Sequence, residues 1–134
     1  RDGIDPHFAQ ADLRAILASL EAEQDRAVVD GWAGKASHAI RSQLSPLSMA
    51  VSLETVERAR GATMADCLRR DLDLTRSTFA HGDVIEGVRA LIIDKDQRPA
   101  WRFKSIGDVS RADVLAMFDS PWTPDTHPLR GLKD

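Results

Sequence analysis

Histidine and cysteine, the side chains that most often act as bases, nucleophiles or metal ligands, are scattered along the 134-residue sequence. The histidines are His7, His38, His81 and His127. No two of them have the short spacing of zinc ligands, and the single cysteine, Cys67, excludes an internal disulfide. Glycine-rich nucleotide loops and the motifs of zinc proteases and serine hydrolases are also absent. The sequence therefore predicts no metal site and no catalytic residue.

Carboxylates are the second group of side chains that could do chemistry, as proton carriers or calcium ligands. Asp94 and Asp96 have the spacing that opens a calcium loop, but the glycine and the closing glutamate of such a loop are missing. Asp71 lies near the apolar stripe of a predicted helix, or it points sideways and pairs with Arg70 or Arg76. We favour a solvated loop for the first two and an ion pair for Asp71.

Acidic and basic side chains are mixed along the sequence, with 18 Lys and Arg against 21 Asp and Glu and a net charge of −3. A nucleic-acid-binding protein usually has a basic stripe, because releasing counterions from phosphates supplies its affinity. The arginine-rich residues 63–79 also include Asp66, Asp71 and Asp73, which disfavours a helix-turn-helix regulator. The sequence indicates no nucleic-acid partner.

Apolar runs extend over only a few residues, such as 90–93, whereas a membrane-spanning helix needs ~18 to 20. The first ten residues show no stretch typical of a signal peptide. The neighbours of Cys67, Met64 and Leu68 among them, favour a small core residue over a reactive thiol. These features predict a reducing, cytoplasmic location and no membrane partner.

Helix caps and apolar periodicity predict an all-α protein of about five to six helices in one domain, residues 1–134. Asp5-Pro6 and Ser45-Pro46 each combine an N-cap acceptor with a proline at the first helical position. Apolar residues then recur at helical spacing after Asp5-Pro6, at Leu13, Ile16, Leu17 and Leu20. The remaining predicted helices are one ending near Ser42 after a break at Gly31 and Gly34, one over 63–79, one over 83–92 and one starting at Ser110.

Small polar residues and glycines predict where these helices begin and end. Three pairs spaced three apart resemble capping boxes: Thr63 with Asp66, Asp83 with Glu86, and Ser110 with Asp113. Gly61 and Gly82 are expected to end helices, Gly82 in a left-handed conformation. The tail 120–134 contains three prolines and is expected to be irregular, and ordered only if Trp122 or Leu129 docks.

Residues 79–101, FAHGDVIEGVRALIIDKDQRPAW, contain the most informative set of motifs. In order they are Phe79, Asp83, Glu86-Gly87-Val88-Arg89-Ala90, the aliphatic residues 91–93, Asp94-Lys95-Asp96 and Pro99-Ala100-Trp101. This pattern resembles the C-terminal signature of the 3-hydroxyisobutyryl-CoA hydrolase-like branch of the crotonase (enoyl-CoA hydratase/isomerase) superfamily. The motifs also have a structural explanation, in which Asp83 caps a helix, Gly87 allows another backbone to approach closely and Trp101 covers a helix surface.

The flanking sequence agrees with this resemblance in order and distance. LSPLSMAVSLETVERAR (44–60) resembles the helix upstream of the signature, and IDPHFAQADLRAILASLEAE (4–23) resembles an earlier I-D-x-x-F segment with its helix. SRADVLAMFDS (110–120) resembles the closing helix of that branch. The resemblance therefore covers nearly the whole chain.

The resemblance implies a C-terminal fragment of a larger enzyme that hydrolyses 3-hydroxyisobutyryl-CoA in valine degradation, or that acts as a related hydratase or isomerase. In such proteins a β/α spiral core binds the acyl-CoA and supplies the oxyanion hole and the catalytic acids. None of that core's sequence is present, so no catalytic residue is assigned and the isolated chain is expected to be inactive. No cofactor is implied, since CoA is part of the substrate.

The resemblance also implies a role for the helices themselves, namely packing over the core, shaping the cleft and forming a homo-oligomer. Helix faces that lack this partner are expected to associate with each other. Lys95 matches a C-terminal lysine that approaches CoA phosphates in the wider superfamily, although Asp94 and Asp96 beside it lower the local positive charge. The alternative from a different class is a stand-alone helical protein-interaction domain.

Overall fold

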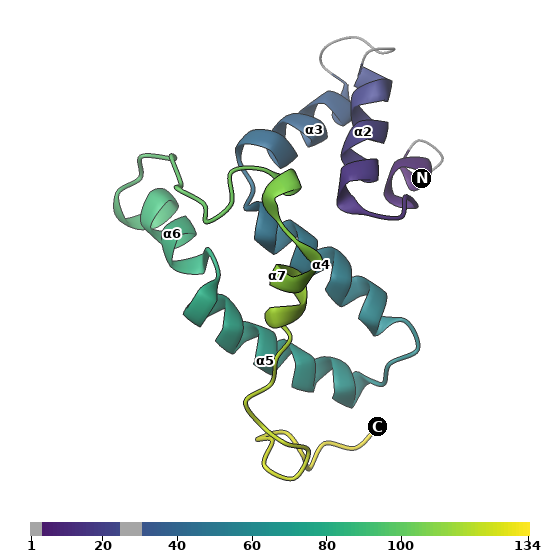
Figure 1. Cartoon of the computed structure of the whole chain (residues 1–134), viewed down its shortest axis with the longest axis vertical. Coiled ribbons are helices and arrows are strands. Elements are labelled where there is room, and N and C mark those ends of the chain that lie inside the picture. Colours follow the sequence, from purple (N-terminus) through teal and green to yellow (C-terminus); the bar gives the residue numbers. More distant parts are fainter. Residues whose placement is uncertain (1–3, 25–30) are drawn as a thin grey trace.

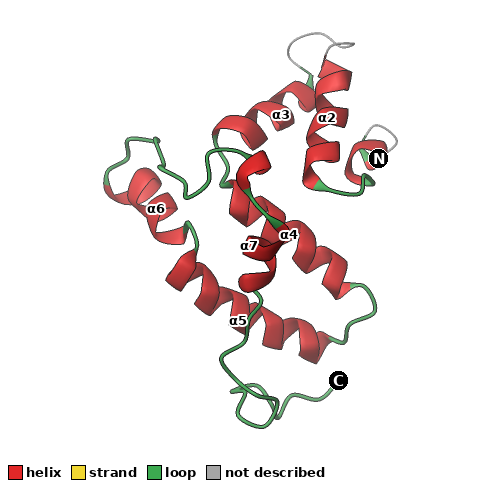
Figure 2. Ribbon diagram, in the orientation of Figure 1, coloured by secondary structure: helices red, strands yellow, loops and turns green. Residues whose placement is uncertain are grey.

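The structure, a computed structural model, describes residues 4–24 and 31–134, and within these ranges it contains helices and loops but no β-strand (Figure 2). The α-helices are α1 (Asp5–Phe8), α2 (Leu13–Gln24), α3 (Trp32–Ser42), α4 (Pro46–Ala59), α5 (Met64–His81), α6 (Val84–Val88) and α7 (Arg111–Ala116). A π-helix, η1 (Arg89–Ile93), follows α6, and a 3-10 turn, η2 (Ile106–Asp108), precedes α7. The all-α prediction is confirmed.

Two of the six expected helices differ from the prediction. The first divides into α1 and α2, because Pro6 opens only a four-residue turn and the longer helix starts after Asp12, whose side chain accepts a hydrogen bond from the backbone of Ala15. The helix expected over 83–92 is α6 continued by the π-helix η1. Of the two glycines expected to mark a break, Gly31 is the N-cap of α3, whereas Gly34 lies inside α3, so the break predicted at Gly34 is wrong. Residues 25–30, before Gly31, lie outside the described residues.

The helix α4 runs through the centre of the molecule and is the element around which the others are arranged (Figure 1). The pair α2 and α3 packs together at one end, and α7 lies across α4. The helix α5 runs from the end of α4 toward α6, which forms the left edge in Figure 1. The C-terminal tail lies at the opposite end from α2 and α3.

The core consists of two apolar clusters that share α4. One cluster joins α4 to α5, α7 and the residue before α7, through Leu47, Val51, Leu74, Val109, Val114 and Met117. The other joins α2 to α3, through Ile16, Leu20, Ala33 and Ile40, and Met49 and Leu53 of α4 pack against it. The apolar stripe predicted from Leu13 to Leu20 is therefore confirmed as the face that α2 buries.

Polar residues at the starts of α4, α5 and α7 form the N-caps that the sequence predicts. Ser45 caps α4 by accepting a hydrogen bond from the backbone of Ser48, and Thr63 caps α5 in the same way. Ser110 and Asp113 form a complete capping box at α7. Such caps satisfy backbone N–H groups that have no partner inside the helix.

Two glycines end helices for different reasons. Gly61 has φ of +74°, the left-handed conformation in which glycine is favoured. The left-handed conformation predicted for Gly82 is wrong, because its φ is −97°. Glycine is needed there for space, since a Cβ at this position would lie 2.7 Å from the carbonyl oxygen of Thr78.

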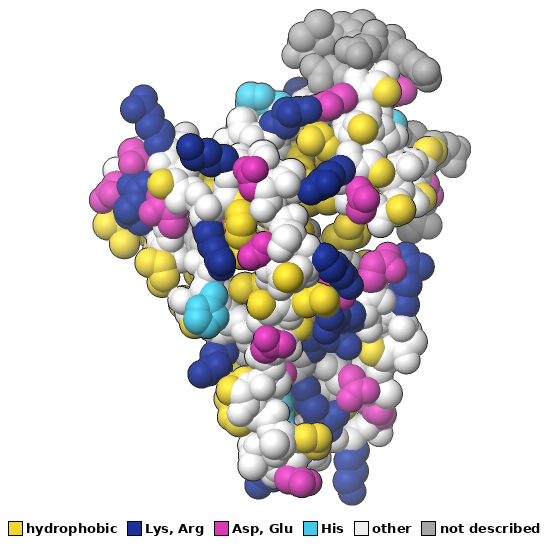
Figure 3. All heavy atoms as spheres, in the orientation of Figure 1, with side chains coloured by type: hydrophobic (Ala, Val, Ile, Leu, Met, Phe, Trp, Pro, Cys, Tyr) yellow, Lys and Arg dark blue, Asp and Glu magenta, His cyan; other side chains and the backbone are white. Residues whose placement is uncertain are grey.

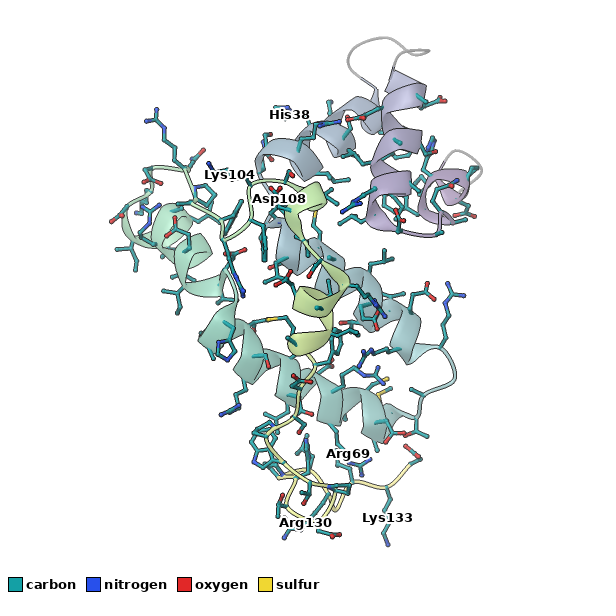
Figure 4. All side chains as sticks on the ribbon, viewed as in Figure 1. His38, Arg69, Lys104, Asp108, Arg130 and Lys133 are labelled. Atoms are coloured by element: carbon teal, nitrogen blue, oxygen red, sulfur yellow. The ribbon has the colours of Figure 1, made fainter. Side chains whose placement is uncertain are left out.

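The tail 120–134 is irregular, as predicted, and it docks against α5. The Arg69 side chain donates to the carbonyl oxygens of Leu129 and Leu132 at 3.2 and 2.7 Å. The Asp134 carboxylate accepts a hydrogen bond from the backbone of Ala65. Figure 4 shows Arg69 on α5 with Arg130 and Lys133 of the tail around it. His127 is buried in this tail, in an edge contact with Trp122.

Candidate functional site

The guanidinium of Arg89 organises the loop that follows η1. Its Nε and Nη2 donate to the two carboxylate oxygens of Glu86 at 2.9 and 2.7 Å. Its Nη1 donates to Asp94 and Asp96 at 2.6 and 2.8 Å, and Nη2 also donates to the carbonyl oxygen of Arg98 at 3.1 Å. These contacts use the five N–H groups that a guanidinium offers. One side chain thus ties three carboxylates and one backbone carbonyl together.

The capping role predicted for Glu86 is wrong. Instead of reaching back to Asp83, its carboxylate holds Arg89 and accepts a hydrogen bond of 2.7 Å from the backbone of Ala100. The Arg89 hydrogen bonds, followed by the Ala100 N–H, lower the pKa of Glu86 to about 2. The same guanidinium lowers the pKa of Asp96, together with the backbone of Arg98. Both carboxylates therefore stay ionised over the physiological range, and Glu86 is not poised to act as an acid.

Lys95 projects from the loop that Arg89 holds. It has a left-handed backbone, with φ of 56°, and so does Gln97, with φ of 55°. Its side chain is exposed and forms no ion pair with any residue the structure describes. Asp94 and Asp96, the acids on either side, both turn back to Arg89. The calcium loop considered for these two acids is thus replaced by an arginine clamp.

Asp83 is a buried residue that joins three segments. Its Oδ2 accepts a hydrogen bond of 2.5 Å from the Ser45 hydroxyl at the start of α4, and its Oδ1 accepts one of 2.9 Å from the backbone of Arg102. Asp83 makes no capping bond to α6, so the predicted cap is wrong for this residue too. Because burying a carboxylate without partners is costly, these two bonds explain how it is accommodated.

The Trp101 side chain lies over Gly87, as the sequence predicted for an aromatic on a helix surface. A Cβ at Gly87 would lie 3.3 Å from the indole ring. The close approach at Gly87 is therefore made by a ring and not by another backbone, which corrects the prediction. This contact anchors the loop exit to α6.

The end of α5, α6 and η1 expose a strip of apolar side chains, called the apolar strip below. It consists of Phe79, Ile85, Val88, Leu91, Ile92 and Ile93. The three consecutive aliphatic residues of η1 are 64–69% exposed, which is unusual for side chains of this kind. Figure 3 shows yellow hydrophobic side chains gathered at the left edge, over α6, beside a mixed charged cluster.

A second apolar surface is a groove of about 730 Å³ between α2, α3 and α4. Its walls include Phe8, Leu44, Met49, Leu53 and Val56. Phe8, Leu44 and Val56 are about half exposed. Sequence reasoning predicted uncovered helix faces in general but did not place this groove, because its walls come from separate helices that the pattern alone cannot orient.

The other residues considered for chemistry are not brought together. Asp71 is exposed, Cys67 is half-buried and His38 is exposed on α3. Within residues 4–24 and 31–134 no three His, Cys, Asp or Glu side chains form a group that could hold a metal ion. No helix of the described part is long and apolar enough to cross a membrane. The described residues thus provide a charged loop and two apolar surfaces.

Comparison with known proteins gives a consistent result. The family described as enoyl-CoA hydratase/isomerase matches residues 1–118. The protein named 3-hydroxyisobutyryl-CoA hydrolase-like protein 1, mitochondrial, from Arabidopsis thaliana is 32% identical over 129 residues, which are 92% of this chain and 32% of that protein. The small ribosomal subunit protein mS47 of the same organism is 30% identical over 88% of this chain and 29% of its own length.

A solved structure is similar in fold as well. The crystal structure of an enoyl-CoA hydratase from Rhodobacter sphaeroides 2.4.1 superposes with a TM-score of 0.76 and 34% sequence identity. The match covers 87% of this chain and 33% of the hydratase. The chain therefore spans about a third of the length of the proteins it resembles.

Proposed function

The chain belongs to the enoyl-CoA hydratase/isomerase family, and we propose that it acts as the C-terminal helical part of a 3-hydroxyisobutyryl-CoA hydrolase-type enzyme. One observation carries this proposal: a hydrolase-like relative matches 92% of this chain, but the match is only 32% of that relative. The reaction proposed for the whole enzyme is hydrolysis of the 3-hydroxyisobutyryl-CoA thioester, as in valine degradation.

The proposed task of the helices is to pack against a catalytic body, shape the acyl-CoA cleft and form subunit contacts. The apolar strip and the groove between α2, α3 and α4 support this task, because apolar surfaces of this kind gain free energy when they are covered. We propose Lys95 as a contact to a CoA phosphate. Its exposed ammonium and the engagement of Asp94 and Asp96 by Arg89 support this role.

The experiment compares two proteins: the 134-residue chain and the full-length product of its reading frame. We expect the full-length protein to release CoA thiol from 3-hydroxyisobutyryl-CoA, and the 134-residue chain to release none. Lys95→Ala in the full-length protein should raise KM for the acyl-CoA with little change in kcat, because the phosphate lies far from the thioester. Turnover by the 134-residue chain, free of full-length enzyme, would contradict the proposal.

Assays of the same full-length protein distinguish thioester hydrolysis from the related hydratase reaction. Hydration of an unsaturated acyl-CoA without thiol release would favour a hydratase, which the fold similarity to the Rhodobacter sphaeroides hydratase supports. The predicted cytoplasmic location is part of the proposal, and imaging of the tagged full-length protein tests it.

A second candidate is a protein-interaction module without catalysis. The similarity to mS47, a protein named as a ribosomal subunit component, favours this candidate. A reading frame that lacks a catalytic region, together with co-purification of the chain with a defined assembly, would support it over the enzyme.

A further inference from the structure

A cleft of about 590 Å³ lies between α2, the end of α3 and the segment that leads into η2. The charged side chains on its walls are Arg14 and Glu21 of α2, Arg41 of α3 and Lys104, which precedes η2 (Figure 4). Arg14 links the two sides directly, because its Nη2 donates a hydrogen bond of 3.0 Å to the carbonyl oxygen of Gly107. This contact joins residues 93 positions apart, so the cleft is formed by the tertiary fold and not by one loop.

The walls of the cleft carry positive charge that no acid of the described part of the chain balances. Arg41 forms an ion pair with Glu21, and this hydrogen bond lowers the pKa of Glu21, so the acid on the walls is ionised and already paired. Arg14 uses one of its five N–H groups on Gly107 and forms no ion pair with a described residue. The Lys104 side chain forms neither an ion pair nor a hydrogen bond with any residue that the structure describes. Two cations are therefore available to an anion.

The floor of the cleft is apolar. Leu17, Ile40 and Ile106 line it, and all three belong to the core cluster that joins α2 to α3 or pack against it. Ile40 is buried, and the other two side chains are half-buried. An inorganic ion would leave this hydrocarbon surface uncovered, whereas an anion with an aliphatic part would cover it and gain free energy.

We infer that this cleft is a binding site for a small aliphatic carboxylate, whose charged end meets Arg14 and Lys104 and whose hydrocarbon part covers the apolar floor. A guanidinium offers a planar pair of donors that matches the two oxygens of a carboxylate, and an ammonium adds a point charge. The volume suits a small molecule. The acid that the proposed hydrolysis releases belongs to this class, but the inference does not depend on that reaction.

The probes are isobutyrate, acetate and isobutyramide, with inorganic phosphate as a competitor. Saturation-transfer NMR of the ligand measures their binding to the 134-residue chain at low ionic strength, since salt screens exposed charges. We expect saturable isobutyrate binding on the order of 1 mM, the scale for so small a ligand. Acetate has less hydrocarbon and should bind more weakly. Isobutyramide has the same shape without the charge and should show no saturable binding, and equimolar phosphate should not displace isobutyrate.

Three variants place the site. Lys104→Met removes the charge and keeps a long side chain, and it should weaken isobutyrate binding about three- to fivefold, the range for one exposed charge contact. Arg14→Gln should weaken binding by a similar factor, although it also loses the hydrogen bond to Gly107. Lys133→Met is the matched control, because Lys133 is an exposed lysine of the tail, at the opposite end of the molecule from α2 and α3 (Figure 4). It should leave binding unchanged.

Each outcome supports or overturns the inference. Isobutyrate binding that Lys104→Met leaves unchanged overturns it, because the carboxylate then binds elsewhere or adventitiously. Equal binding of isobutyrate and isobutyramide, no saturable binding of isobutyrate, or displacement by equimolar phosphate also overturns it. Circular dichroism checks the helix content of each variant. If Arg14→Gln loses helix content, Lys104→Met decides, since the Lys104 side chain has no described contact to lose. The expected pattern supports the inference whether or not the full-length protein hydrolyses a thioester.

Discussion

At the scale of single residues, the Ser45 hydroxyl lies where three segments of the chain meet. It caps α4 and donates to the buried Asp83, whose other oxygen accepts from the backbone of Arg102. The sequence predicted the cap from the Ser-Pro pair, because capping is a local property. The bond to Asp83 spans 38 positions and follows from tertiary packing, which local patterns do not encode.

Ser45→Ala should lower the free energy of unfolding by about 1 to 3 kcal/mol, because it removes a cap and leaves a buried carboxylate short of a donor. Chemical denaturation followed by circular dichroism measures this. Ser52→Ala, which removes an exposed hydroxyl bonded to Ser48 on the same helix, is the control and should stay within about 0.5 kcal/mol of the wild type. Equal effects of the two substitutions would contradict the role of Ser45.

The ionisation of Glu86 makes the free energy of unfolding depend on pH under acidic conditions. Its pKa is lowered from 4.5 to about 2 in the folded protein, so its ionised form favours folding at all pH values above 4.5. That contribution is lost as the pH falls from 4.5 toward 2, where the folded protein must also take up the proton. We therefore expect the difference in unfolding free energy between wild type and Glu86→Gln to be constant above pH 4.5 and to shrink toward pH 2.

Denaturation curves of both proteins at several pH values check this expectation. Acids that do not contact Arg89, Glu54 and Asp113 among them, change both proteins alike, so the difference reports on Glu86 together with Asp96, which shares Arg89 with it. A difference that stays constant down to pH 2 would show that Arg89 does not hold Glu86 in the folded state.

At the scale of elements, the sequence predicted which segments are helical better than it predicted their ends. Periodicity and caps predicted both bounds of α4 and α5, the end of α3 and the start of α7 close to where the structure has them. The sequence did not predict the change to a π-helix at η1. This change depends on a hydrogen bond from the Asp94 N–H to the Arg89 carbonyl oxygen and on the contacts of the Arg89 side chain with the following loop. The sequence motif includes Arg89 but indicates no structural role for it, and no pattern predicts that Asp94 and Asp96 bind its guanidinium.

Two exposed glycines offer a matched test of how α4 ends. Gly61→Ala should lower the free energy of unfolding by about 1 kcal/mol, because alanine is strained at a φ of +74° even though a Cβ has open space there. Gly131→Ala also has open space but no positive φ, and should be neutral or slightly stabilising. Thermal or chemical denaturation measures both, and equal losses would argue against left-handed strain as the cause.

At the scale of the whole molecule, the chain leaves apolar surface uncovered on two sides. The all-α class and the general exposure of helix faces were predictable, because composition and periodicity fix how much apolar surface the helices carry. Which side chains remain outside was not predictable. It depends on how α5, α6 and η1 are oriented, and the apolar strip is visible only in the folded arrangement.

We expect the 134-residue chain to self-associate at micromolar concentration through the apolar strip. Ile92→Glu places a charge in the middle of the strip and should shift the chain toward monomer, because a buried unpaired charge disfavours association. Met64→Glu, at the far end of α5 and 72% exposed, is the control and should leave association unchanged. Sedimentation velocity or light scattering measures this, and a wild-type monomer at high concentration would rule out the prediction.

The position of α4 between two clusters has a consequence for how the sequence can change over time. Leu47 and Val51 serve one cluster, while Met49 and Leu53 serve the other. Few positions on this helix can therefore be substituted without affecting one of the two core clusters. In an alignment of homologues α4 should vary least among the helices, and substitutions at Val51 should be accompanied by changes at Leu74 or Met117, whereas those at Leu53 should accompany changes in α2 or α3.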